Sequence, residues 1–311
     1  MTDAPRWISP LRYPGGKARM AGALTGIWHS QFTFLDLAIW VEPFAGGAGA
    51  GLHLLETNVI EELWLVEKNP ALAAFWRMAA HRGDELAAAV RALEPDMAQW
   101  HRAREIVAAA YEQESIDDAS VALAALVLNR CSRSGMVNPR VGPIGGKNQT
   151  GRWTIRARWN ADGIAERIER VYRRSDQIRV DEGDAITRIQ ELDGSVGIED
   201  EVMLFVDPPY LVQGNGLYAN GMSEQDHRDL AAALTGSAAH WILTYDADDR
   251  VPALYPAHRV LAYEIPNTAN RQRIAEEYAV FSPFLDVQED LHLLPKGSSR
   301  WVQRINEPAA A

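Results

Sequence analysis

The sequence predicts an α/β protein with a mostly parallel sheet covered by helices on both faces. Short apolar runs bounded by turn residues recur along the 311-residue chain, and each has the length of a buried strand. Amphipathic helical patterns such as Asp226–Leu234 separate most of these runs. Strands that alternate with helices favour a parallel sheet with helices on each side. Because 47% of the residues are hydrophobic, the chain can bury a large core.

Seven apolar runs are predicted to be strands. In chain order they are Leu37–Val41, Leu63–Val66, Gln177–Val180, Val202–Val206, Trp241–Thr244, Val260–Ile265 and Tyr278–Phe281. Between the second and third runs, Ala71–Asn129 shows about three amphipathic helices and no strand pattern. A loop rich in Gly, Arg and Asn, Arg130–Asn160, follows. We therefore predict a main domain at residues 1–70 and 166–311 and an inserted helical domain at residues 71–165.

Charge is unevenly distributed along the chain. The formal net charge is −11, yet the stretch Asn129–Arg174 contains eleven Lys or Arg against three Asp or Glu. The remainder of the chain therefore carries −19. An acidic body with one basic segment indicates a single face that meets phosphates. A solvated basic loop and helix is the alternative that charge alone leaves open.

The cysteine count and the apolar runs indicate a cytoplasmic protein without a membrane segment. Cys131 is the only cysteine, so no internal disulfide can form and a reducing compartment fits. The first residues lack the apolar run of a signal peptide, and Val121–Leu128 is too short to cross a bilayer. The eight His and one Cys show no zinc-like spacing, so no metal site is predicted.

A glycine-rich turn follows the first predicted strand in LAIWVEPFAGGAGAGLHLLE. Its glycines permit a tight turn and bring a ligand close to the N–H groups of a new helix. Glu67 ends the second strand, where an acid is well placed to accept the two hydroxyls of a ribose. Because no GxGxxG or GxxxxGK[ST] pattern occurs, an adenosine-containing cofactor is favoured over a dinucleotide or triphosphate. A purely structural turn and an ordinary helix-start acid are the alternatives.

The quartet DPPY, residues 207–210, directly follows the buried run Val202–Val206. Proline has no N–H for a strand ladder, fixes its own φ and restricts the residue before it. The quartet therefore holds an acid and an aromatic ring on a stiff backbone.

Near the N-terminus, SPLRYPGGKARM combines a glycine pair with Lys17, which is either a ligand-binding cation or part of a flexible arm.

Four motifs, RYPGGK, VEPFAGGAGAGL, LVEKN and FVDPPY, occur in the order found in the Dam-like, alpha-group (D12 class) DNA adenine-N6 methyltransferases. The sequence resembles this family over nearly its whole length, with weaker similarity at ALVLNR, EGDA and WILTYDADD. The resemblance implies a Rossmann-like class I methyltransferase sheet with an inserted helical target-recognition domain. It also implies methyl transfer from S-adenosylmethionine to the N6 amino group of a flipped adenine in double-stranded DNA.

The resemblance assigns a role to residues of each motif. It places in the cofactor site Tyr13, Lys17, Glu42, Phe44, Gly46, Gly49, Glu67 and Asp184. Within this set Lys17 faces the methionine carboxylate, Glu67 holds the ribose hydroxyls and Asp184 lies near the adenine amino group. The catalytic motif comprises Asp207, Pro208, Pro209 and Tyr210.

The catalytic motif suits transfer to an exocyclic amino group. The lone pair of that nitrogen is delocalised into the ring and must be directed at the methyl carbon. The Asp207 carboxylate and the Pro208 carbonyl can each accept one of its N–H groups, which favours the charge that develops in the transition state. Tyr210 offers a face on which a flipped base can stack.

Cationic residues of the basic loop are predicted to contact DNA phosphates or bases. They are Arg130, Arg133, Lys147, Arg152, Arg156 and Arg158. The alternation in TIRARW predicts a short hairpin strand that puts Arg156 and Arg158 on one face. Trp153 and Trp159 are predicted to pack beneath the loop, and stacking on the nucleic acid is the alternative.

The recognition loop differs from that of the Dam proteins. Arg133 and Ser134 replace an aromatic residue and an asparagine, and GPIGGKNQTGRW is more similar to phage and prophage members. GATC specificity is therefore not carried over.

Other interpretations are the same fold acting on an RNA adenine, a cytosine N4 or a protein glutamine amide, and a DNA-binding relative without turnover. The resemblance implies an enzyme that acts either alone or beside a separate cognate restriction endonuclease, and no oligomeric state is predicted.

Overall fold

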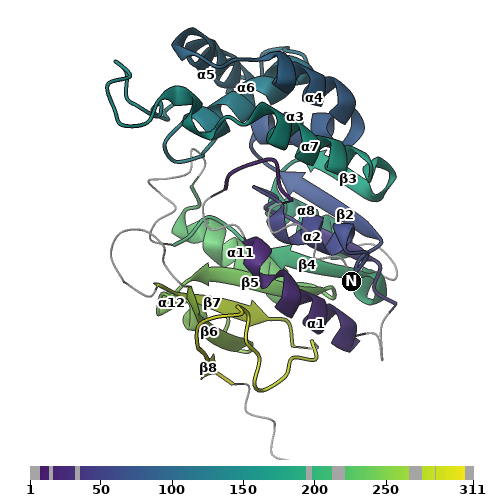
Figure 1. Cartoon of the computed structure of the whole chain (residues 1–311). Helices are drawn as coiled ribbons and strands as arrows, with labels where there is room; N and C mark the ends of the chain where they lie inside the picture. The colour runs from purple at the N-terminus through teal and green to yellow at the C-terminus, as the bar shows by residue number, and fades with distance from the viewer. Residues whose placement is uncertain are drawn as a thin grey trace, which may run out of the picture. The chain divides into compact units, whose positions relative to one another are not determined.

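The computed structural model describes residues 8–13, 17–31, 36–193, 198–211, 221–265, 275–283 and 285–304. Its strands form one eight-stranded sheet in the order β3-β2-β1-β4-β5-β7-β6-β8. Together with the helices, this sheet confirms the predicted α/β class (Figure 1). The chain divides into two compact units. The first unit comprises Met1–Ala18, Ala45–Glu56 and Glu62–Asp184, and the second comprises Arg19–Phe44, Thr57–Glu61 and Ala185–Ala311.

The first unit combines a parallel strand pair with a group of helices. Its elements are β2 (Glu62–Glu67), β3 (Ile178–Glu182), α2 (Gly49–Glu56), α3 (Pro70–His81), α4 (Gly83–Ala92), α5 (Met97–Tyr111), α6 (Asp118–Cys131), η2 (Ile155–Arg158), α7 (Ala161–Tyr172) and η3 (Ser175–Gln177). The alanine-rich α3 and α6 pack together, as do α5 with α6 and α4 with α7 (Figure 1). The region predicted to hold about three helices therefore folds as four, α3 to α6.

Local capping signals explain where these helices begin. The side chains of Asn69, Asp96 and Asp117 accept backbone N–H groups at the starts of α3, α5 and α6. Such caps satisfy donors that have no partner inside the helix. Pro70 occupies the first position of α3, where its missing N–H costs nothing. None of the helices formed by the described residues is long and apolar enough to cross a membrane.

The helical region does not end at the predicted boundary. Residue 165 falls inside α7, which is continuous and packs against α3 and α4. Arg91 of α4 pairs with Glu169 of α7 at 2.6 Å. Arg77 of α3 pairs with Asp118 at 2.7 Å and with Glu182 at the end of β3 at 2.9 Å. The division into a main and an inserted domain stays a prediction, and its boundary at residue 165 falls within the continuous helix α7.

The second unit contains the rest of the sheet. Its elements are α1 (Ala21–Gln31), β1 (Ile39–Glu42), α8 (Ala185–Asp193), α9 (Ile198–Glu201), β4 (Val202–Val206), α11 (Glu224–Gly236), β5 (His240–Asp246), α12 (Arg250–Leu254), β6 (Arg259–Ile265), β7 (Ala275–Phe281) and β8 (Ser299–Gln303), while η1 (Lys17–Met20) leads into α1. Strands β1, β4 and β5 are parallel. Strand β7 is antiparallel to both β5 and β6, and β8 is antiparallel to β6. The prediction of a parallel sheet therefore holds for β1, β4 and β5 but not for β6, β7 and β8, whose pairings are antiparallel.

Buried aromatic residues hold the parallel strands in register. Trp40 of β1 is 0% exposed and stacks on Phe205 of β4 with ring centroids 5.5 Å apart. The ring centroid of Trp28, on α1, lies 5.9 Å from that of Trp40. All five residues of β4 are buried, as expected for a central strand with both faces covered. This packing places the carboxyl ends of β1 and β4 at the same edge.

Candidate functional site

The glycine-rich turn of the first unit is held from several sides. Gly46 has a φ of 46°, a left-handed conformation that glycine adopts without strain. Its N–H donates to Glu67 Oε2 at 2.9 Å, and its carbonyl accepts Trp76 Nε1–H at 3.0 Å. Tyr13 lies directly on the turn, because a Cβ on Gly47 would come 2.6 Å from the Tyr13 Cβ. The structure thus brings together Tyr13, Gly46 and Glu67, three of the predicted cofactor residues.

Glu67 is half-buried at the end of β2. Its other oxygen, Oε1, accepts the N–H of Asn69 at 2.9 Å. Burial raises the pKa of the Glu67 carboxyl, the backbone hydrogen bonds oppose that rise, and the negative charge of Glu182 adds to it. Glu182 is its partner in the β2–β3 register. An acid with this environment can accept further hydroxyl groups.

The remaining predicted residues of the first unit take different positions. Gly49 begins α2 beside Ala18, since a Cβ there would lie 3.3 Å from the Ala18 Cβ. Asp184 follows β3 and pairs with Lys68 at 3.0 Å. Lys17 begins η1 and is only 6% exposed. The Pro-Gly-Gly segment of RYPGGK, residues 14–16, lies outside the described residues. Trp76 was not predicted, since nothing in the sequence marks a helical tryptophan as a support for a turn.

In the second unit the DPPY motif, which is predicted to be catalytic, follows β4 directly. Glu42 ends the parallel strand β1, is buried and accepts Trp40 Nε1–H at 3.2 Å. Phe44 lies two residues further on and is half-buried. The carboxyl ends of parallel strands meet at one edge of a sheet, where α/β proteins bind ligands. Glu42 and Asp207 therefore belong to the same edge of this unit.

Strand β5 holds the catalytic motif at two points. Thr244 Oγ1–H donates to Asp207 Oδ1 at 2.7 Å, and Leu211 N–H donates to Asp246 Oδ1 at 3.0 Å. The Asp207 carboxylate is thus oriented before any ligand binds. Thr244 and Asp246 lie in the WILTYDADD segment, whose similarity to the family was weak. No residue role was predicted for them.

Tyr210 is anchored at its far end. Its phenol donates to the Glu277 carboxylate on β7. Burial raises the pKa of the Tyr210 phenol well above its usual range, and the negative charges of Asp207 and Glu277 add to this effect. The phenol therefore stays protonated and acts as a donor. Glu277 carried no sequence signal, because its partner lies 67 residues away along the chain.

The basic loop, residues 130–160, is closed onto the end of α6. Ile144 N–H donates to the Cys131 carbonyl at 2.9 Å. Gln149 accepts Ile155 N–H at 2.8 Å and donates to the Ile144 carbonyl at 2.7 Å. The predicted hairpin strand in TIRARW is wrong, because Ile155–Arg158 forms the 3-10 helix η2. A short alternating run becomes a strand only where a partner strand lies beside it.

The predicted DNA-binding residues differ in exposure. The exposed ones are Arg133, Lys147, Arg152, Arg156 and Arg158. Arg156 also donates to the Pro95 carbonyl at 2.9 Å and to Glu94 at 3.0 Å. Arg130 is 7% exposed and donates to the Pro10 carbonyl. Burial, with the nearby positive charges of Arg167 and Arg12, lowers the pKa of Arg130 to about 10. This environment favours a role for Arg130 in holding the N-terminal segment rather than in contacting DNA.

The two tryptophans of the loop behave differently. Trp159 is half-buried and donates Nε1–H to the Leu93 carbonyl at 3.1 Å, as predicted for a packing residue. Trp153 is 62% exposed, so the prediction that it packs beneath the loop is wrong. The Arg152 guanidinium lies over its ring at 5.2 Å. An exposed arginine–tryptophan pair thus stands on the loop surface.

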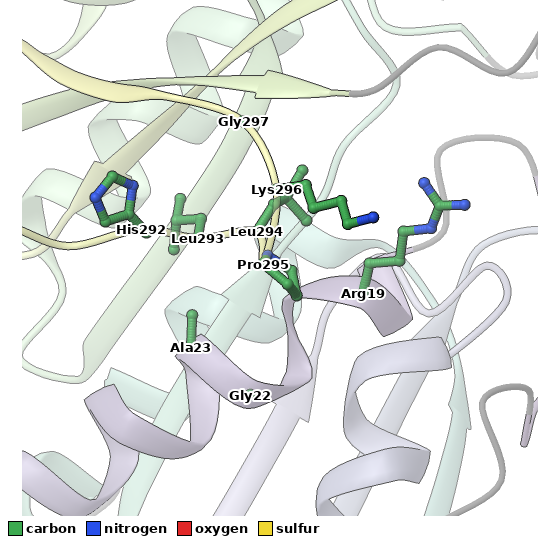
Figure 2. Close-up of a pocket in the computed structure, with 9 residues that line it drawn as sticks. All are labelled: Arg19, Gly22, Ala23, His292, Leu293, Leu294, Pro295, Lys296 and Gly297. Carbon is green, nitrogen blue, oxygen red and sulfur yellow. The ribbon is translucent and has the colours of Figure 1, made fainter.

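A separate open cavity of about 450 Å³ lies in the second unit (Figure 2). It is lined by Arg19, Gly22, Ala23 and the segment 292–297 before β8. Figure 2 shows that Lys296 and Arg19 carry the cationic groups of this lining. None of the predicted site residues lines the cavity.

The sheet, the glycine-rich turn with its strand-end acid and the DPPY motif define a methyltransferase of the α/β type. The chain belongs to the D12 class N6 adenine-specific DNA methyltransferase family, whose model matches residues 13–267. It is therefore an enzyme that methylates adenine in DNA. No curated protein matches the chain. Protein LPL1258 from Legionella pneumophila str. Philadelphia 1 is similar at 9% identity, with a TM-score of 0.35 over 93% of this chain and 97% of that one, and this likeness carries no argument.

Proposed function

We propose that the protein transfers a methyl group from S-adenosylmethionine to the N6 amino group of an adenine flipped out of double-stranded DNA. The observation that carries the proposal is the DPPY motif, in which Thr244 orients the Asp207 carboxylate at 2.7 Å and two prolines stiffen the backbone. Family membership supports adenine in DNA as the methyl acceptor. The site residues support S-adenosylmethionine as the methyl donor and a flipped base as the substrate.

The first unit offers residues that fit the cofactor. Glu67 accepts backbone N–H groups from Gly46 and Asn69, and its remaining lone pairs can accept the two ribose hydroxyls. Lys17 would pair with the methionine carboxylate, and the turn at Gly46 brings backbone close to the ligand. Asp184, after β3, would accept the adenine amino group. The bound cofactor supplies the methyl group.

Replacing Gly47 with alanine is expected to weaken cofactor binding by about tenfold or more. The new Cβ would come 2.6 Å from the Tyr13 Cβ, so either Tyr13 or the turn must move. Isothermal titration with S-adenosylmethionine measures the change. Gly22→Ala is the matched control, because nothing lies within 4 Å of a Cβ there and α1 accepts alanine well. Equal affinities for Gly47→Ala and the control would contradict the role given to the turn.

In the reaction, Asp207 and Pro208 act on the adenine amino group. The Asp207 carboxylate accepts one N–H and the Pro208 carbonyl accepts the other. These hydrogen bonds strengthen as the nitrogen becomes pyramidal and positively charged. Because Thr244 and the prolines already orient both acceptors, little reorganisation is needed. The methylated nitrogen loses its proton to water late in the reaction.

A base inside a duplex must leave the stack before it reaches these acceptors, at a cost of a few kcal/mol. The Tyr210 ring would receive the flipped base, and stacking on an aromatic ring stabilises it by about 1–3 kcal/mol. The two hydrogen bonds to the amino group add to this term. Together these contacts can offset most of the cost of flipping.

Arg152→Ala is expected to weaken DNA binding and to reduce the slope of log K against log salt by about one unit. Arg152 is exposed on the basic loop beside Trp153, where it can neutralise a phosphate. Fluorescence anisotropy with a long duplex at several salt concentrations measures both quantities. Arg82→Ala is the control, because Arg82 is an exposed arginine of the same unit that pairs with Glu85. An unchanged slope for Arg152→Ala would place the DNA interface elsewhere.

The whole proposal is tested by expressing the protein in a host without DNA methylation. Sequencing with a method sensitive to N6-methyladenine should reveal a recurrent methylated site in the genome. Parallel analysis of total RNA and of cytosine N4 addresses the alternative acceptors. New methyl groups on RNA or cytosine, with none on DNA adenine, would overturn the proposed substrate.

A further inference from the structure

Glu277, a carboxylate outside the DPPY motif, is hydrogen-bonded to Tyr210 of that motif. Glu277 on β7 is 6% exposed. Its Oε1 accepts the Tyr210 phenol, and its Oε2 accepts the Tyr263 phenol at 2.6 Å. A buried carboxylate is costly unless hydrogen bonds compensate it, and here each oxygen has a phenol donor. The hydrogen bonds among Tyr210, Glu277 and Tyr263 therefore connect the DPPY motif to strands β7 and β6.

Strand register explains how this carboxylate meets the motif. Glu277 pairs with Asp246 of β5 and with Tyr263 of β6, and Figure 1 shows β5, β7 and β6 side by side. Paired residues on neighbouring strands point to the same face of a sheet. Asp246 accepts the N–H of Leu211, the residue that follows Tyr210. One row of side chains across three strands thus holds the end of the motif.

We propose that Glu277 is a positioning residue for methyl transfer, which fixes the Tyr210 ring by holding its phenol. The inference rests on the proposed function, since it uses the ring as the stacking surface for the flipped adenine. Two prolines fix the backbone before Tyr210, and the phenol bond fixes the far end of its side chain. A ring that is already fixed loses little rotamer freedom when a base stacks on it. Tyr263 in turn orients the carboxylate through its second oxygen.

The test compares Tyr210→Phe, Glu277→Gln and the double variant with the wild-type enzyme. Tyr210→Phe keeps the ring and removes its anchor, and Glu277→Gln replaces a carboxylate oxygen by an amide. Each single change is expected to lower kcat on genomic DNA from a methylation-free host by about tenfold, the effect of losing a hydrogen bond to a charged group. The double variant is expected to lose no more than Tyr210→Phe alone, because without the phenol the group at position 277 no longer holds the ring at position 210.

A neighbouring phenol provides the matched control. Tyr278 follows Glu277 on β7, so its side chain faces the other side of the sheet. Tyr278→Phe is expected to keep the wild-type kcat. Dissociation constants for S-adenosylmethionine are measured for every variant and are expected to stay unchanged, because the cofactor residues are other side chains. A general loss of folding would lower the affinity for cofactor as well.

Two results would overturn the inference. One is a wild-type kcat in Tyr210→Phe, which does not depend on whether Glu277→Gln folds. The other is a double variant whose loss is the product of the two single losses. If the wild-type protein itself transferred no methyl group to DNA adenine, the proposed function would fail and the inference with it. An active wild type with unaffected variants would overturn the role of Glu277 alone.

Discussion

Asp207→Ala is expected to abolish measurable methyl transfer, a loss of about 10³-fold or more in kcat. The change removes the acceptor that we propose directs the adenine amino group, while the Pro208 carbonyl remains. Thr244, which donates to Asp207 at 2.7 Å, also loses its acceptor. Affinity for S-adenosylmethionine is expected to be retained, because its proposed contacts are other residues. The measurement is the N6-methyladenine content of genomic DNA by nucleoside mass spectrometry, together with cofactor titration.

An exposed aspartate of the same unit provides the control for this change. Asp229 on α11 is exposed and accepts Gln225 Nε2–H at 2.7 Å. Asp229→Ala also removes an aspartate carboxylate, but from the surface of a helix. It should leave kcat within about twofold of wild type, because surface substitutions usually have small effects. Wild-type activity in Asp207→Ala would refute the mechanism. Loss of cofactor binding in that variant would point instead to a structural role for Asp207.

Glu67→Gln is expected to weaken cofactor binding by about 10- to 100-fold at high pH. The substitution is also expected to make the affinity for the cofactor independent of pH. A hydrogen bond to a charged group contributes about 1.5–3 kcal/mol, which corresponds to that range of affinity. The amide also places an NH₂ group where the carboxylate now accepts the N–H groups of Gly46 and Asn69. Titration of both proteins with cofactor at several pH values measures the effect.

The sign of the pH dependence follows from the environment of Glu67. Burial raises its pKa, so protonation begins at a higher pH than for a free glutamate. In the proposed site, an ionised carboxylate is needed to accept both ribose hydroxyls. In the wild type, affinity is therefore full above the raised pKa and falls as the pH is lowered through it. Cofactor binding stabilises the ionised form and is expected to release protons in that same range.

Glu182→Gln tests the same argument without touching the proposed ligand contact. Its negative charge contributes to the raised pKa of Glu67. Removing that charge is expected to move the midpoint of the affinity profile to lower pH and to leave affinity at high pH unchanged. An unshifted midpoint in this variant, or a persistent pH dependence in Glu67→Gln, would show that another group titrates.

Features that depend on neighbouring residues in the chain were predicted closely. The predicted run Val202–Val206 has the same bounds as β4, because a short apolar segment followed by Asp207 and two prolines is typical of a buried strand. The other six strand predictions each overlap an observed strand. The turn at Gly46 and the acid at the end of β2 were also recognisable, since each depends on a local pattern of residues.

Features that depend on distant partners were missed or predicted wrongly. Strand β8 has alternating exposure and no apolar run, and it exists because β6 offers an edge to pair with. Residues 155–158 alternate like a strand but form η2, and they pair with none of the strands in the described part of the chain. Trp153 is hydrophobic yet exposed, since burial depends on what packs above it.

The chemistry of the site divides in the same way. The residues proposed to carry out the reaction, Asp207 to Tyr210, are contiguous, so the motif can be recognised from their order in the chain alone. The residues that hold them still are Thr244, Asp246 and Glu277, and each comes from a different position along β5 or β7. A hydrogen bond between residues 35 or more positions apart leaves no local pattern, because the sheet pairing that creates it is a property of the whole unit.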